Sequence, residues 1–128
     1  MALSQSDTEL YERARTAAAN AHAPYSDFPV GAALRTVDGA VLTGVNVENG
    51  SYGLTSCAER NAVFTAVGAG HRAFDAIAVH ADAGSSPPCG ACRQVLAEFA
   101  PEIRVIWRRE GEVVVSSLAA LLPERFVL

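Results

Sequence analysis

All three cysteines of this chain lie in two short motifs, each of which is predicted to begin a helix. The first is Thr55–Arg60, with the sequence TSCAER, and the second is Pro87–Arg93, with the sequence PPCGACR. Three cysteine thiolates can bind one Zn²⁺ and leave its fourth tetrahedral position open to water, which distinguishes a catalytic zinc from a structural one. The fold must therefore bring two helix starts that are far apart in the sequence to a single point.

The residues around the cysteines suit a catalytic metal site. Glu59 stands two residues after Cys57, where its carboxylate can move the protons of a bound water. A helix N-terminus lowers the pKa of a thiol, and soft sulfur ligands in a tetrahedral site favour zinc. Three thiolates leave about one net negative charge on the site, so we expect Arg60, with Arg93 as a second candidate, to donate hydrogen bonds to the sulfurs.

The composition indicates one globular domain spanning residues 1–128, because half of the residues are apolar and 19% are charged. The net charge is -4, the chain has no Lys, and its Arg residues are scattered, which argues against a nucleic-acid partner. No signal-peptide pattern and no apolar run of ~18 residues is present, so we expect a cytoplasmic protein without a membrane partner. An odd number of cysteines with a Cys-x-x-Cys fits metal or redox chemistry better than a disulfide framework.

The order of the predicted elements indicates an α/β fold. A Ser6-x-x-Glu9 capping box and apolar residues at helical spacing predict a first helix over residues 7–22, which ends near Pro24. A hairpin follows. The later elements are predicted as a helix over residues 57–67 capped by Ser56, a strand over 75–80, a helix from the second cysteine motif to Phe99, strands over 103–107 and 112–115, and a short helix to Leu121 capped by Ser116 or Ser117.

This order predicts a three-layer α/β/α arrangement with a five-stranded mixed sheet and helices on both faces. In such sheets ligands bind at the carboxyl ends of strands, where the following helices begin. Both cysteine motifs stand at these helix starts, so the sequence places the metal site and the ligand site together.

The hairpin is predicted from Asp38-Gly39, which separates two apolar runs at residues 30–37 and 40–47. This dipeptide is typical of a two-residue type I′ turn, which would put Val37 opposite Ala40, Gly31 opposite Asn46 and Val30 opposite Val47. We therefore expect Phe28, Asn46 and Glu48 to lie at one end of the hairpin and to offer a ring, an amide and a carboxylate there.

Each of these features also has a simpler interpretation. Cys89 and Cys92 alone could be a redox pair, and His80 could complete a closed structural zinc site as a fourth ligand. Glu59 could only complete a capping box with Ser56. Asn46 and Glu48 alone would be ordinary polar residues at a loop edge, and Phe28 alone would belong to the core. The combination of all of them in one chain favours the catalytic interpretation.

These motifs resemble the zinc nucleoside and base deaminase superfamily, through Cys57–Glu59 and Pro88–Gln94. More narrowly, the chain is similar to the small, homotetrameric cytidine deaminases whose zinc ligands are all cysteines. The resemblance covers about residues 7–126. The further matching segments are Pro24–Ser26 with Phe28, Val30–Ala33, Gly44–Asn49, Ser51–Leu54, Cys57–Arg60, and Leu121–Pro123 with Phe126.

The resemblance implies a cytidine deaminase fold, one Zn²⁺ held by Cys57, Cys89 and Cys92, and attack of a zinc-activated water on C4 of cytosine. Glu59 would be the general acid and base. The remaining implied roles are ribose contacts for Asn46 and Glu48, packing on the base for Phe28, a peptide N–H to the pyrimidine carbonyl for Ala58, a subunit boundary for Tyr52, and a ring reaching a neighbouring subunit's site for Phe126.

The implied activity is conversion of cytidine and 2′-deoxycytidine to the uridines with release of ammonia, in pyrimidine salvage. One alternative is deamination of a modified cytosine nucleoside, as in the blasticidin deaminases. Another is a non-catalytic binding module stabilised by zinc. The chain departs from many relatives at Gly50, Ser56 and Asn61, none of which is a predicted ligand or acid-base residue.

Overall fold

Five strands form one mixed sheet in the computed structural model, which describes residues 1–128. The strand order is β2-β1-β3-β4-β5; β3 and β4 are parallel and every other neighbouring pair is antiparallel. The strands are β1 (Val30–Thr36), β2 (Val41–Val45), β3 (Phe74–Ala81), β4 (Arg104–Arg109) and β5 (Glu112–Ser117). The predicted five-stranded mixed sheet is confirmed.

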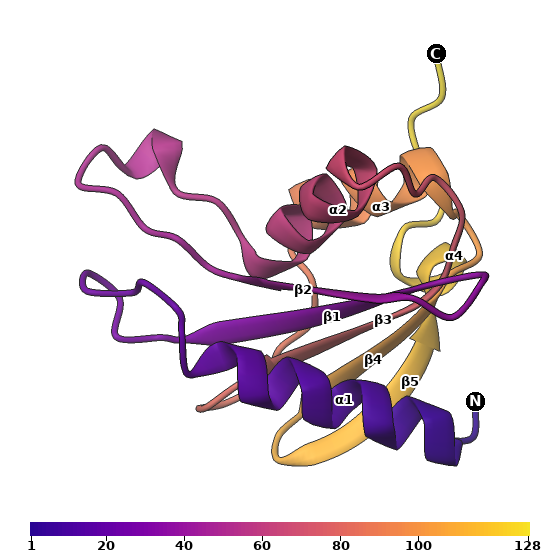
Figure 1. Ribbon diagram of the computed structural model, residues 1–128, viewed down its shortest axis with the longest axis horizontal. Coiled ribbons are helices and arrows are strands. Elements are labelled where there is room, and N and C mark those ends of the chain that lie inside the picture. The colour runs from indigo at the N-terminus through magenta and orange to yellow at the C-terminus, as the bar shows by residue number, and fades with distance from the viewer.

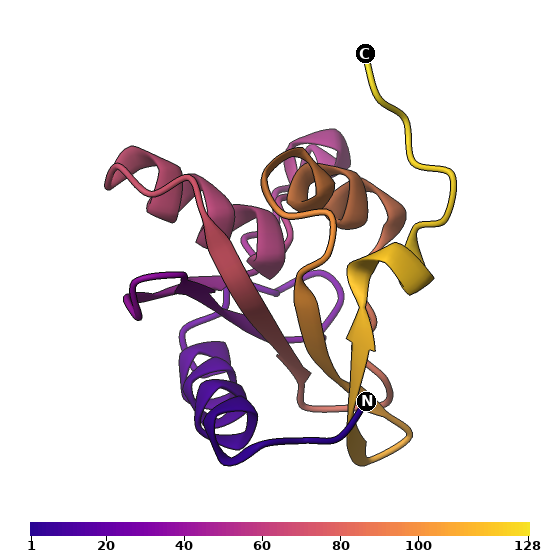
Figure 2. The same cartoon turned by 90° about the vertical axis from the view of Figure 1, so that its right-hand side faces the viewer.

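Helices cover both faces of this sheet, as predicted. The helices are α1 (Gln5–Ala18), α2 (Ala58–Gly68), α3 (Gly90–Phe99), α4 (Leu118–Leu121) and the short 3-10 helix η1 (Tyr52–Leu54). Figure 1 shows α1 along one face, with α2 and α3 over the other, and Figure 2 shows the same layers after a quarter turn. No helix in the chain combines the length and the apolar character needed to cross a membrane.

The alternation of side chains along the strands divides the core into two layers. On the α1 face the buried residues include Leu10, Tyr11, Ala14, Ala33, Ala76, Ala78 and Ile106. On the face of α2 and α3 they include Ala32, Leu34, Ala62, Val63, Ile77, Val79, Leu96, Val105 and Trp107. Successive residues of β3 thus point to opposite helical layers, which assigns Val79 to the layer of the cysteine helices and His80 to the layer of α1.

α1 begins and ends earlier than predicted. Ser4, not Ser6, is its N-cap: the Asp7 N–H donates to the Ser4 hydroxyl at 3.1 Å, and the Ser4 N–H donates to the Asp7 carboxylate at 2.9 Å. The helix ends at Ala18 instead of residue 22, because the backbone of His22 pairs with the segment after β2. Its N–H donates to the Asn46 carbonyl at 3.0 Å.

The loop between β1 and β2 has three residues, Val37–Gly39, so the predicted two-residue turn is wrong. The Thr36 N–H donates to the Ala40 carbonyl at 2.8 Å, and the Thr36 hydroxyl accepts the Ala40 N–H at 3.0 Å. Within the loop only Gly39 has a positive φ, of 94°. A type I turn followed by one left-handed residue has this pattern, whereas a type I′ turn needs positive φ at two positions.

The extra loop residue shifts the hairpin register by one, so Gly31 lies opposite Val45 and not opposite Asn46. Asn46 stands one step beyond the end of β2. The expected meeting of side chains at this end of the hairpin still occurs, because Phe28, Asn46 and Glu48 line the same pocket.

The later elements lie within a few residues of the predicted ranges, apart from one cap. Cys57, not Ser56, is the N-cap of α2, and the Ser56 hydroxyl donates to the Asn61 side chain at 2.8 Å. Ser117 caps α4, as expected: its hydroxyl accepts the Ala120 N–H at 3.1 Å.

Candidate active site

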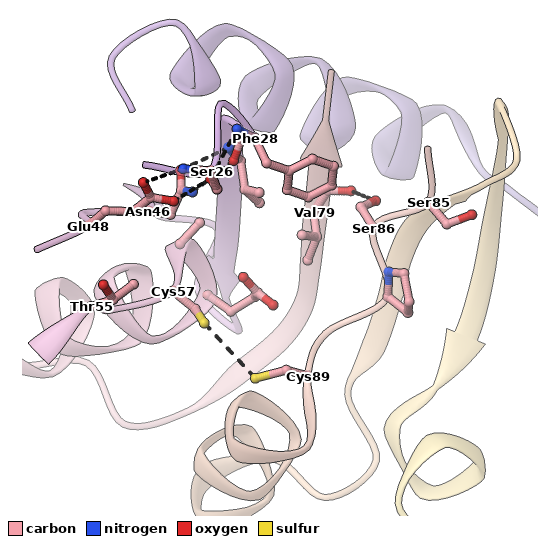
Figure 3. Close-up of a pocket in the computed structure, with 14 residues that line it drawn as sticks. Ser26, Phe28, Asn46, Glu48, Thr55, Cys57, Val79, Ser85, Ser86 and Cys89 are labelled. Carbon is pink, nitrogen blue, oxygen red and sulfur yellow. Dashed lines mark hydrogen bonds between the residues drawn. The ribbon is translucent and has the colours of Figure 1, made fainter. Parts of the chain in front are cut away.

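The starts of α2 and α3 bring the three cysteines together. Cys57 is the N-cap of α2, Cys89 is the N-cap of α3, and Cys92 lies one turn into α3. Their sulfur atoms all lie within 4.8 Å of one another, and the Cys89–Cys92 distance is 3.3 Å. Figure 3 shows Cys57 and Cys89, whose sulfur atoms are 4.0 Å apart. Three clustered thiols form a donor set that suits Zn²⁺.

Arg60 supplies the positive charge that this donor set requires. Its Nη2 donates to the Cys57 sulfur at 3.1 Å. Hydrogen bonds from Cys92 and then from Arg60 lower the pKa of Cys57 to about 5, while the bond to Cys57 raises the pKa of the buried Cys92. Arg93, the second candidate for this role, instead donates at 2.7 Å each to two backbone carbonyls, those of Pro88 and Leu121.

No fourth His, Cys or acidic side chain joins the cysteine cluster. His80, which the alternative of a closed structural site would use as a fourth ligand, points into the α1 layer. Its Nδ1 lies 2.6 Å from the Tyr11 hydroxyl and its Nε2 lies 2.9 Å from Asp82. A set of three protein ligands is the arrangement that leaves a coordination position for water or substrate.

Glu59 is buried beside the cysteines, with 5% of its surface exposed. Burial is the main reason that its pKa is raised to about 7, and the negative charge of Cys57 adds to the effect. A carboxyl group with a pKa near neutrality can both accept and donate a proton at physiological pH. Because Cys57 is the N-cap and Ser56 bonds elsewhere, Glu59 does not complete a capping box with Ser56.

A pocket of about 430 Å³ opens between the cysteines and the hairpin end. Four segments form its wall: the stretch leading into β1, the stretch after β2, the start of α2, and the loop that follows β3 (Figure 3). The lining residues are Ser26, Phe28, Val30, Asn46, Glu48, Thr55, Cys57, Ala58, Glu59, Val79, Ser85, Ser86, Pro87 and Cys89. Seven predicted site residues, Phe28, Asn46, Glu48, Cys57, Ala58, Glu59 and Cys89, are therefore brought together.

Asn46 and Glu48 use much of their hydrogen-bonding capacity within the protein. The Asn46 amide donates to the Phe28 carbonyl and accepts the Val30 N–H, both at 2.9 Å. Glu48 accepts the N–H groups of Tyr25 and Ser26, at 2.9 and 3.1 Å, and the Ser26 hydroxyl. The Ser26 hydroxyl is the main cause of the lowered pKa of Glu48, which therefore stays ionised at neutral pH.

Tyr52 and Phe126 lie outside the pocket of this chain. Tyr52 is 76% exposed and meets the Tyr25 ring edge-on, with 6.1 Å between ring centroids. Phe126 is 70% exposed and belongs to the C-terminal tail, which leaves the body of the molecule at the end opposite η1 in Figure 1. The Phe126 carbonyl accepts a hydrogen bond from Gln94 at 3.1 Å.

Several lining residues were not among the predicted site residues. Ser26 belongs to the Pro24–Ser26 segment of the resemblance, Ser85 and Ser86 directly precede the second cysteine motif, and Pro87 is the first residue of that motif, so their positions in the sequence carried a signal. Val79 carried a weaker one: the alternation along β3 indicates which face it occupies, but not that the pocket reaches it.

Comparison with known proteins settles the family. Residues 4–107 match the family model described as the cytidine and deoxycytidylate deaminase zinc-binding region. The chain belongs to this family. The matched range includes both cysteine motifs, Glu59 and the hairpin end. The three-cysteine cluster of the structure fits the zinc-binding region that the family model describes.

Individual members of the deaminase family match nearly the whole chain. A cytidine deaminase of Halalkalibacterium halodurans is 48% identical over 91% of this chain and 91% of its own length. The crystal structure of a cytidine deaminase from Burkholderia pseudomallei has a TM-score of 0.88 and 51% identity, and covers 93% of this chain and 98% of that one. A blasticidin-S deaminase of Bacillus cereus is 31% identical over 97% of this chain and 94% of its own length.

Proposed function

We propose that this protein hydrolytically deaminates cytidine and 2′-deoxycytidine to uridine and 2′-deoxyuridine, releases ammonia, and so serves pyrimidine salvage. The observation that carries the proposal is the position of the buried Glu59, beside three clustered cysteines and in one pocket with Asn46 and Glu48. Glu59 and the cysteines, which can carry out proton transfer on the base, thus lie at one side of a nucleoside-sized pocket. Asn46 and Glu48, which can bind a sugar, lie at another side.

The cysteine cluster and Glu59 divide the chemistry. Cys57, Cys89 and Cys92 hold the zinc, which when bound supplies Lewis-acid activation of a water molecule at neutral pH. Glu59 takes one proton from the attacking water and delivers it to N3 as the water oxygen bonds to C4. It then takes the second proton from that oxygen and delivers it to the amino group, which leaves as ammonia when the C4–N bond breaks. Arg60 holds the Cys57 sulfur and balances its charge.

Ala58 and Phe28 hold the base for this reaction. Ala58 is the first residue of α2, so its N–H has no partner within the helix and is available to the pyrimidine carbonyl. The ring of Phe28 lies across the pocket from Cys57 and Cys89 (Figure 3). From this position it packs on the base.

The hydrogen-bond count at the hairpin end supports acceptance of both sugars. A carboxylate has about four acceptor positions, and three of those on Glu48 are used within the protein. Asn46 keeps one N–H of its amide free. One hydroxyl can donate to Glu48 and accept from Asn46, so the site recognises a single sugar hydroxyl that ribose and 2′-deoxyribose share.

The charges that line the pocket favour nucleosides over nucleotides. The lining residues include the carboxyl groups of Glu48 and Glu59 but no Arg, Lys or His. A 5′-phosphate would enter without a cation to pair with, next to an ionised Glu48. We expect deoxycytidine to be deaminated much faster than deoxycytidine monophosphate.

The decisive test is the ultraviolet absorbance of cytidine mixed with the zinc-loaded protein. The proposal expects the spectrum of cytidine to change into that of uridine, with one ammonia released for each uridine formed. An unchanged spectrum with fully zinc-loaded protein contradicts it. Parallel reactions with 2′-deoxycytidine and its monophosphate test the sugar and phosphate expectations.

A modified cytosine nucleoside such as blasticidin S is the second candidate substrate, because a blasticidin-S deaminase is 31% identical to the chain. The higher identity to cytidine deaminases, and a sugar side built from Asn46 and Glu48, favour cytidine. A competition assay with both substrates separates the two. A third possibility is a non-catalytic zinc module, which would need a fourth protein ligand such as His80. His80 instead bonds to Tyr11 in the opposite layer, which disfavours this possibility.

We further propose a cytoplasmic homotetramer in which Phe126 of one subunit reaches the site of a neighbour and Tyr52 lies at a subunit boundary. The support is that both rings are largely exposed and lie outside their own chain's pocket. The three free thiols suit a reducing compartment. Sedimentation at micromolar concentration tests the assembly, and a monomer mass contradicts it.

A further inference from the structure

The hydroxyl of Ser86 stands between β3 and β4 where these two strands part. The strands pair in parallel from Ala76 opposite Arg104 to Ala78 opposite Ile106, and no further. Just beyond, the Ser86 hydroxyl donates to the Val79 carbonyl at 2.8 Å and accepts the Arg108 N–H at 2.9 Å (Figure 3). One side chain thus links a carbonyl of β3 to an N–H of β4.

Ser86 also replaces β3 as the backbone partner of Arg108. The Ser86 N–H donates to the Arg108 carbonyl at 2.8 Å. On the edge of β4 that faces β3, the N–H and the carbonyl of Arg108 therefore both bond to Ser86. On its other edge Arg108 pairs with Val113 of β5. Because Ser86 occupies the edge of β4, β3 cannot pair there.

This separation shapes the pocket. Val79, Ser86 and Pro87 all line it, and Cys89 follows Ser86 by three residues. We propose that Ser86 is a positioning residue, which holds β3 and β4 apart and thereby fixes the pocket wall beside the cysteines. The catalytic side of this proposal rests on the proposed deaminase function.

Other contacts anchor the loop without Ser86, so its effect can be isolated. Arg108 Nη1 donates to the carbonyls of Ala81 and Asp82, at 3.0 and 3.3 Å, and His80 contacts the Asp82 carboxylate. Removal of the Ser86 hydroxyl leaves these contacts in place. It frees the buried Val79 carbonyl and the partly buried Arg108 N–H, which can then bond directly to each other and would draw β3 and β4 together.

Ser85 provides a matched control. Its hydroxyl also accepts a backbone N–H, that of Glu110 at 2.9 Å, and it also lines the pocket. It does not lie between two strands. If Ser86 acts only as a polar residue of the pocket wall, both serines should respond alike to replacement by alanine.

The kinetic test compares Ser86→Ala, Ser86→Thr and Ser85→Ala with the wild type. For Ser86→Ala we expect KM for cytidine to rise about tenfold while kcat changes less than about threefold, because the narrowed wall obstructs substrate while Glu59 stays in place. The zinc content should not change. Ser86→Thr, which keeps the hydroxyl, and Ser85→Ala should both stay within about twofold of wild-type KM. Equal KM values for all four proteins overturn the proposal.

A crystal structure of Ser86→Ala tests the separation of the strands independently of activity. We expect a direct hydrogen bond from the Arg108 N–H to the Val79 carbonyl, and an unchanged β3–β4 spacing overturns the proposal. Wild-type protein without cytidine turnover would refute the proposed function but leave this structural test in force. If Ser86→Ala does not fold, Ser86→Val against Ser86→Thr compares a methyl with a hydroxyl at the same size, and equal KM values again overturn the proposal.

Discussion

At the residue scale, the first turn of α2 places three side chains of the site: those of Cys57, Glu59 and Arg60. Glu59 is the second residue of α2, so the first turn of the helix carries the carboxyl group into the pocket while Cys57 caps the same turn. Arg60, one residue later, reaches the Cys57 sulfur. One turn of helix therefore carries a zinc ligand, the proposed acid-base group and a counter-charge.

Replacing Glu59 by glutamine tests its acid-base role. Glutamine keeps the shape of the side chain but cannot carry the proton, so we expect kcat for cytidine to fall roughly 10²–10⁴-fold. Zinc content, measured by atomic absorption, should stay at the wild-type level. The matched variant Glu48→Gln should chiefly raise KM. Near-wild-type kcat in Glu59→Gln would assign proton transfer to another group.

Arg60→Ala should weaken zinc binding. Loss of a side chain that bonds a metal ligand typically reduces metal affinity 10–100-fold. Competition with a coloured chelator measures this change. Arg60→Lys keeps the charge but not the fork of donors, so we expect an intermediate affinity. Unchanged affinity in Arg60→Ala would show that the bond to Cys57 does not support the metal site.

At the scale of elements, the close approach of α2 to β2 fixes where the site forms. A Cβ atom at Gly44 would lie 2.4 Å from the Ala58 carbonyl oxygen and 2.4 Å from the Ala62 nitrogen. Both atoms belong to the backbone and cannot move aside cheaply. The first turn of α2, with Cys57 and Glu59, therefore rests against a strand position where only glycine fits.

Gly44→Ala should destabilise the protein and disturb the zinc site together. Overpacking of a tight contact costs roughly 1–3 kcal/mol, and the shift of α2 would displace Cys57 relative to α3. Urea unfolding and zinc content measure the two effects. Gly68→Ala is the control, because nothing lies within 4 Å of a Cβ atom at the end of the same helix. Equal stability of both variants would contradict this role for Gly44.

The cysteine site could be predicted because the spacing of residues within each motif indicates it. The turns and helix caps could not, because several nearby side chains can form the same hydrogen bonds and the sequence does not show which one does. Cys57 and Glu59 are held by one helical turn, whatever the rest of the fold does. Asp38-Gly39 suits both two-residue and three-residue loops, and the Thr36 side chain decides between them through its bond to Ala40. The position of Ser86 just before the second cysteine motif carried a signal, but no local pattern indicates its two bonds, because its partners come from two strands.

At the scale of the whole molecule, Asp7 joins the first helix to β4, two strands away from β1 in the sheet. Its carboxylate is fully buried, completes the cap with Ser4 and accepts hydrogen bonds from Arg104 of β4. Burial alone would raise the pKa of Asp7, but the bonds from Arg104 and Ser4 outweigh it and lower the pKa. The N-terminal layer is thus attached by an ionised group.

Acid should weaken this attachment. Because the pKa of Asp7 is lower in the folded state, the unfolded state binds more protons as the pH falls. The stabilisation is complete above the unfolded pKa of about 3.8 and is lost as the pH drops through the lower folded value. Urea unfolding at a series of pH values should show this decline. Asp7→Asn should be less stable at pH 7 by roughly 1–3 kcal/mol and should show a flatter acid dependence.

The double use of Asn46 limits how the sugar preference of this protein can change. Its amide bonds to the Phe28 carbonyl and the Val30 N–H and so closes the end of the hairpin, and the proposed function gives the same amide a contact with the sugar. Glu48, by contrast, gathers its bonds from a neighbouring loop. Mutant libraries that seek deaminases of sugar-modified nucleosides should therefore vary Glu48 and Ser26 and keep Asn46 constant, because most substitutions there would be lost to misfolding before they were screened for substrate.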